Sequence, residues 1–160
     1  MLSQTVLRTA LWLSLGLWIG SWGFFAFVVS RIAFQTLPGN VAGDLAGSLL
    51  EILQFGGAVA ALVAAAAAAA LGRRGLLVGL PVVLALVCLF SELWLSPQVE
   101  LVRPSVLGAA STVVTAERFR IYHGLSLGLF IGVHIASMVL VLLHARLDAR
   151  AARALARVAN

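Results

Sequence analysis

Four long apolar stretches constrain the fold of this chain more than any other feature. A helix needs about 20 mostly apolar residues to cross the hydrocarbon core of a bilayer. Helices that meet this requirement are predicted at about 7–34, 41–71, 76–95 and 117–146. Only 11% of the residues are charged, against about 25% in a soluble domain. The sequence therefore predicts an all-α integral membrane protein, a four-helix bundle in which residues 1–160 form a single transmembrane domain.

The arginines predict how this bundle lies in the membrane. Four spans place both termini on one side, and that side carries seven arginines at positions 8, 73, 74, 146, 150, 153 and 157. The other side carries Arg31, Arg103, Arg118 and Arg120. Because positively charged loops stay inside, we expect both termini in the cytoplasm, with the protein in a bacterial inner (plasma) membrane.

Two segments outside the predicted spans are expected to contact the membrane surface. Residues 96–116 are predicted to form a long outer loop, apolar enough to lie along the membrane surface. Residues 147–160 are predicted to form a basic cytoplasmic tail. On a helix, Arg146, Arg150, Arg153 and Arg157 share one face, which suits contact with anionic lipid headgroups. The lipid bilayer is thus the first predicted partner.

Ionisable residues fall at one depth, near the predicted outer ends of all four helices, and His134 lies deeper in the last helix. Such groups usually face the interior of a membrane bundle, paired or solvated. The candidate polar site consists of Arg31, Glu51, Gln54, Glu92, Glu117, Arg118, His123, Ser126 and His134. A simpler alternative stays open, in which the arginines lie at the headgroups and neutralise the glutamates. For His134, a hydrogen bond to a neighbouring helix is the corresponding alternative.

Small residues form a second pattern. Glycines recur every four residues at Gly39, Gly43 and Gly47, and again at Gly124, Gly128 and Gly132. This spacing lets helix backbones approach closely, which favours helix packing in lipid. In the last span the glycine stripe lies away from the stripe of His123 and His134. We therefore expect that helix to pack on two sides, either centrally in the bundle or against another protomer.

Two groups of residues resemble a known family. Phe34, Leu37 and Pro38 are followed closely by Ala42 and Gly43. The last span opens with His123, Gly124 and Ser126, preceded by Glu117 and Arg118. In their order and spacing these residues resemble the transmembrane protein 205-like family, catalogued as domain of unknown function 4149. The resemblance implies a four-helix membrane protein, with an animal member linked to platinum-drug tolerance, and it implies no established reaction.

Three functions are compatible with these patterns. The first is a protein related to transport, or to stress and drug tolerance, whose polar site opens outward. The second is a non-catalytic accessory or assembly subunit, including a homo-oligomer. The third, haem or metal binding by His123 and His134, is disfavoured because the two lie too far apart to ligate one iron. The sequence carries no phosphate-binding loop, histidine metal motif or nucleophile elbow, so we expect no enzyme, no cofactor and no metal. Because the arginines are divided between the two membrane faces, we also expect no nucleic-acid partner.

Overall fold

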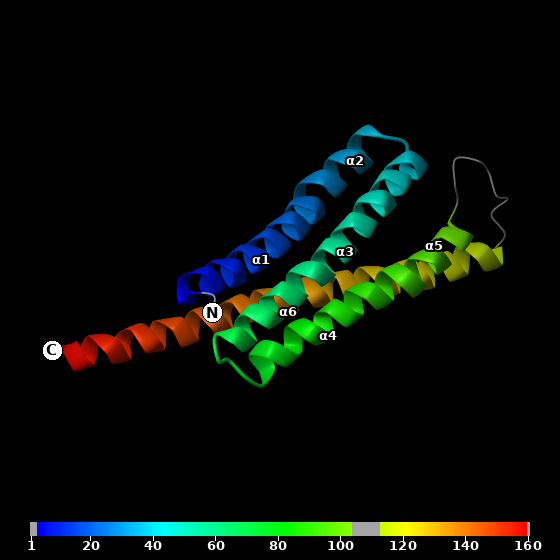
Figure 1. Ribbon diagram of the computed structural model, residues 1–160. Helices are drawn as coiled ribbons and strands as arrows, with labels where there is room; N and C mark the ends of the chain where they lie inside the picture. The colour runs from blue at the N-terminus through cyan, green and yellow to red at the C-terminus, as the bar shows by residue number, and fades with distance from the viewer. Residues whose placement is uncertain (1–2, 104–112, 160) are drawn as a thin grey trace.

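The computed structural model describes residues 3–103 and 113–159, and the regular structure in this part of the chain is entirely helical. Figure 1 shows the elements as long rods. Their bounds are α1 Gln4–Phe24, η1 Phe25–Val29, α2 Ser30–Thr36, α3 Gly39–Ala70, α4 Leu76–Phe90, η2 Ser91–Leu95, α5 Ser96–Val102 and α6 Val113–Ala159. The segments η1 and η2 are single π-helical turns that keep α1–α2 and α4–α5 continuous.

Four of these rods are long and apolar enough to cross a membrane. They are Gln4–Thr36, Gly39–Ala70, Leu76–Val102 and Val114–Ala154. This confirms the predicted all-α membrane bundle of four helices. Figure 1 also shows both chain ends at the end of the bundle that holds the α3–α4 turn, here called the α3–α4 end. The opposite end, with the α2–α3 turn and α5, is called the α2–α3 end.

The helix bounds differ from the prediction around the outer loop. The third rod was predicted to end at residue 95, but it continues through α5 to Val102. Pro97 is typical of a helix end when it is read from sequence, yet here it lies in the first turn of α5, where its missing N–H is tolerated. The last helix begins at Val113 and runs through the predicted tail to Ala159. Of the predicted loop 96–116, residues 104–112 lie outside the described residues.

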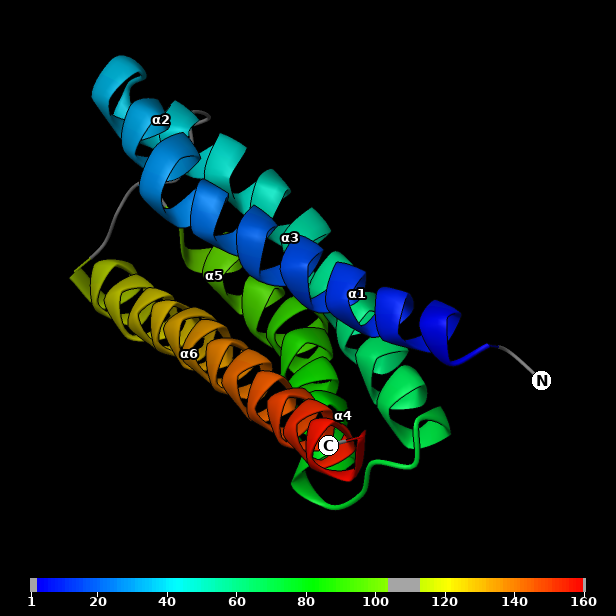
Figure 2. The same ribbon diagram turned by 90° about the vertical axis from the view of Figure 1, so that its left-hand side faces the viewer.

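Helix α3 is the centre of the bundle. It makes the most extensive helix contacts, with α1 on one side and α4 on the other, while α6 packs against α4, α5 and α1. Figure 2 shows the same arrangement, with α1 lying along α3 and α6 lying along α4–α5. In their most apolar windows, 44% of α3 is buried but only 22% of α6. Of the two arrangements expected for the last helix, a central place in the bundle is therefore not seen.

The contact between α1 and α3 is a tryptophan–alanine interface. Trp18 and Trp22 of α1 are buried, and the facing residues of α3 are small, including Ala58, Ala61 and Ala64. The Trp22 indole N–H donates to the backbone oxygen of Leu53 at 3.1 Å. Small side chains allow the two helices to approach closely, and the large indole rings fill the remaining space.

A buried ionic cluster fixes the α3–α4 end. Gly72 and Gly75, with φ of 76° and 60°, supply the left-handed conformations of the turn. Between them Arg73 turns inward, where its Nη2 pairs with Asp148 of α6 at 2.5 Å and its Nη1 contacts Nδ1 of the buried His144. The cluster joins the α3–α4 turn to the C-terminal half of α6.

The tryptophan–alanine interface generates a prediction about two adjacent glycines. A Cβ on Gly57 would lie 2.8 Å from Nε1 of Trp18, whereas a Cβ on Gly56 would meet nothing within 4 Å. Overpacking a filled interface costs about 1–3 kcal/mol. We therefore expect Gly57→Leu to lower the free energy of unfolding by this amount in mild detergent, measured by denaturant titration. The matched variant Gly56→Leu should be as stable as the wild type. Equal stability of both variants would contradict this packing.

Candidate functional site

A large cavity opens at the α2–α3 end, between α2–α3 on one side and α5–α6 on the other. Its volume is about 1350 Å³, above the roughly 300–1,000 Å³ of typical small-molecule sites. Every one of the four rods contributes to its wall. The polar lining residues are Ser30, Asn40, Asp44, Ser48, Glu51, Glu92, Ser96, Glu100, Arg103, His123 and Ser126.

Aromatic rings form the floor of the cavity. Phe130 of α6 stacks on Trp22 of α1, with ring centroids 4.5 Å apart and planes 1° from parallel. Phe25 meets the edge of Phe130 at 6.0 Å. Phe25 and Phe130 both line the cavity and are both buried. This contact between α1 and α6 closes the cavity toward the middle of the bundle.

Two carboxylates in the cavity wall lack a basic partner among the described residues. They are Glu51 of α3 and Glu92 of η2. Glu92 accepts a hydrogen bond of 3.2 Å from the Ser96 hydroxyl, one turn later. His123 of α6 also lines the cavity, with its ring stacked on Phe119 at a centroid distance of 5.3 Å. Acidic and aromatic groups therefore face one space.

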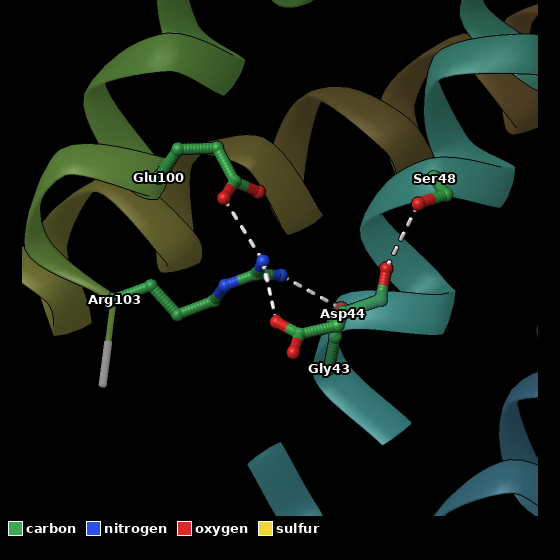
Figure 3. A network of polar contacts seen from close by, with 5 residues as sticks. All are labelled: Gly43, Asp44, Ser48, Glu100 and Arg103. Carbon is green, nitrogen blue, oxygen red and sulfur yellow. Dashed lines mark hydrogen bonds and ion pairs between the residues drawn. The ribbon is translucent and has the colours of Figure 1, made fainter. Parts of the chain in front are cut away.

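A guanidinium group ties the rim of the cavity together. Figure 3 shows Arg103, at the end of α5, between Glu100 and the first turns of α3. Its Nη1 donates to the backbone oxygen of Gly43 at 2.8 Å, and its Nη2 pairs with Asp44 at 2.7 Å and with Glu100 at 2.9 Å. A Cβ on Gly47 would lie 3.1 Å from Nη1, so a glycine makes room for the arginine. Arg103 thereby joins α5 to α3.

Both π-helical turns lie at the level of the cavity. Phe25 and Ala26 of η1 and Glu92 of η2 are lining residues. Ser91 of η2 is buried and accepts a hydrogen bond of 3.0 Å from the amide nitrogen of Gln54. Single π turns inside α-helices are frequent at functional sites, since the extra residue changes which side chains face inward.

The structure brings together four of the residues predicted for the polar site: Glu51, Glu92, His123 and Ser126. Three residues that the prediction left out join them, namely Asp44, Glu100 and Arg103. The sequence predicts Arg103 only as a charge outside the membrane. Its place three residues after Glu100 would have indicated a pair on one helix face, but residues 96–116 are predicted to be a loop.

The other predicted site residues lie elsewhere. Arg31 of α2 is exposed and is not a lining residue, so it lies outside the cavity that Glu51 and Glu92 line. Glu117 and Arg118 are exposed on the first turns of α6, outside the lining. Gln54 is buried against Ser91. The four residues thus remain outside the wall of the cavity.

His134 lies one turn beyond the aromatic floor. Its ring packs near Gly23 of α1, where a Cβ would be 3.8 Å from the ring. Its buried Nδ1 has no hydrogen-bond partner among the described residues. A hydrogen bond from this atom to a neighbouring helix is therefore not seen. Within the described residues no three His, Cys, Asp or Glu side chains are placed to share a metal ion.

The predicted packing glycines do not bring helices together inside the described part of this chain. Gly39, Gly43 and Gly47 line the cavity, and only Gly47 has a close neighbour, the Arg103–Glu100 pair. On α6 a Cβ at Gly124, Gly128 or Gly132 would meet nothing within 4 Å. Contact of this face with another protomer stays a prediction.

The fold and the cavity define the class of the protein, a small polytopic α-helical membrane protein with a largely apolar cavity at one end of the bundle, whose wall also carries charged side chains. Residues 13–104 match the family described as Domain of unknown function (DUF4149), and the chain belongs to that family. The predicted membership is confirmed, whereas the likeness to transmembrane protein 205 stays a prediction. Glu51, Glu92 and Arg103 lie inside the matched region, and His123 lies beyond it. No curated protein and no solved structure matches the chain.

The rim network predicts different roles for two outer arginines. Replacing Arg103 with Ala leaves Asp44 and Glu100 without their cation. We expect the free energy of unfolding to fall by about 1–2 kcal/mol. This is less than for a fully buried ion pair, because water screens these partly exposed acids. Hydrogen exchange measured by mass spectrometry should become faster in 40–48 and 98–103. Arg31→Ala is the matched control and should leave exchange in both segments unchanged. Wild-type exchange in the Arg103→Ala protein would contradict the tie between α3 and α5.

Proposed function

We propose that this protein is transport-related, and that it binds a small solute in the cavity at the α2–α3 end. The observation that carries the proposal is a cavity of about 1350 Å³ into which Glu51 and Glu92 bring uncompensated carboxylates. Ionisable groups in membrane spans cost free energy and mark solute or ion pathways. A purely structural bundle gains nothing from two such groups facing an open space.

The proposed orientation places the cavity toward the outside. The arginine excess on the side of the termini supports a cytoplasmic α3–α4 end, in a bacterial inner membrane. At this end α6 extends past the other helices (Figure 1), and Arg146, Arg150, Arg153 and Arg157 are exposed on it. Anionic lipid headgroups are the proposed partners of these side chains.

The proposal assigns the protein no catalysed reaction and no cofactor. Binding in the cavity needs only charge pairing with the carboxylates and burial of apolar surface against the aromatic floor. Capture of a toxic solute in such a cavity is consistent with a role in stress or drug tolerance, and an animal member of the resembled family is linked to platinum-drug tolerance. The open glycine face of α6 supports a second candidate, an accessory subunit whose partner helix covers Gly124, Gly128 and Gly132.

A tryptophan in the cavity distinguishes the two candidates. Ser126 lines the cavity, whereas Ile135, on the same helix, is 53% exposed on the outside of the bundle. In a deletion strain challenged with a panel of toxic organic solutes, wild-type protein and the Ile135→Trp control should restore growth. Ser126→Trp should raise sensitivity by about tenfold or more, as expected when about 1.4 kcal/mol of binding is lost.

The outcome depends on comparable amounts of each variant in the membrane, measured by immunoblot. Full restoration by Ser126→Trp would contradict solute binding in the cavity. Failure of Ile135→Trp, with full restoration by Ser126→Trp, is the pattern expected if the outer face of α6 binds a partner helix.

A further inference from the structure

The charges in the cavity point to the chemical class of its solute. Among the described lining residues, the carboxylates are Asp44, Glu51, Glu92 and Glu100, and the one guanidinium is that of Arg103. Arg103 is already paired with Asp44 and Glu100 at the rim. Carboxylates are thus in excess of guanidinium groups among these lining residues. The part of the wall formed by Glu51 and Glu92 therefore offers negative charge to an incoming solute.

The apolar part of the wall limits the solute further. Phe25, Phe34, Phe119 and Phe130 all line the cavity. The faces of aromatic rings attract cations, most strongly where water is excluded. Divalent metal ions need several oxygen ligands in one tight shell, and no three candidate ligands are placed for one in the described part of the chain. A cavity of about 1350 Å³ is also far larger than such an ion.

We propose that the cavity binds organic cations with an apolar, aromatic-sized body, and that Glu51 and Glu92 hold their positive charge. This inference rests on the proposed solute-binding function and names its substrate class. The apolar body lies against the floor formed by Phe25 and Phe130. The positive charge lies between α3 and η2, where the two carboxylates face the same space. Anions are disfavoured because the rim guanidinium is already paired.

Two probes of the same shape and opposite charge test this inference. Tetraphenylphosphonium and tetraphenylborate are each added to the purified full chain in mild detergent, and binding is measured by equilibrium dialysis against protein-free micelles. The wild-type protein should bind the phosphonium and not the borate at the same concentration. This comparison uses the wild-type protein, so it does not depend on the folding of any variant.

Substitutions then locate the charge that matters. Glu51→Gln and Glu92→Gln should each weaken phosphonium binding about tenfold, the effect of losing about 1.4 kcal/mol of attraction, and the double variant should abolish it. Glu117→Gln is the matched control, because Glu117 is an exposed carboxylate outside the lining. It should bind like the wild type.

The possible failures are distinguishable. Borate binding as tight as phosphonium binding, lost in Ser126→Trp, would overturn the cation class while supporting a solute-binding cavity. Phosphonium binding that is equal in the wild type and the double glutamine variant would overturn the role of the carboxylates. Binding of neither probe would overturn the inference, whereas the growth experiment with Ser126→Trp decides the proposed function separately.

Discussion

The cost of placing charge among apolar helices governs where the polar side chains of this bundle lie. At the α3–α4 end, Arg73 is buried against Asp148 and His144. At the other end Arg103 is held by Asp44 and Glu100. Each arginine joins two elements that are far apart in the sequence, because a largely buried guanidinium is far less favourable alone than with a carboxylate beside it. The two ionic clusters therefore define the ends of the bundle as much as its turns do.

Against this background Glu51 and Glu92 stand out. They lie on neighbouring rods and face a cavity, and no described residue supplies them with a cation. The packing of side chains differs on the two sides of these carboxylates. Toward the middle of the bundle, Trp22, Phe25 and Phe130 fill the space between α1 and α6. Toward the α2–α3 end, glycines at the start of α3 leave space open. The tightly packed part of the bundle thus ends at the aromatic floor, and Glu51 and Glu92 lie on the open side of it.

Much of the fold follows from hydropathy alone. Four apolar stretches require four spans, and the alternating direction of the spans brings Glu51, Glu92 and His123 to one depth. This part of the site was predictable because the rise of an α-helix and the number of crossings determine it. The depth of a residue does not determine the direction of its side chain, however. Arg31, for example, is exposed on α2 and does not line the cavity.

The remaining features depend on local hydrogen bonding and on shape. Pro97 predicts a helix end, yet the helix continues after the π turn η2. A prediction from sequence therefore places Glu100 and Arg103 in a loop and not beside the cavity. The central place of α3 comes from its alanines, whose small size matters only once tryptophans lie opposite them. In α6 the glycine spacing indicates packing, but inside the described chain its glycine face has no partner. Such features can be predicted only when the neighbouring helix is known.

The central claim is a water-accessible cavity that opens at the α2–α3 end and is closed by its aromatic floor. Ser126 lies above this floor and Ser137, on the same stripe of α6, lies beyond it and is fully buried. Each can be replaced by cysteine in a Cys88→Ala background, since Cys88 is the one native cysteine. The most direct measurement is the rate at which a membrane-impermeant thiol reagent, added outside cells, labels each variant. Ser126→Cys should react readily and Ser137→Cys should not. An unreactive Ser126→Cys, or equal labelling of both positions, would contradict the account.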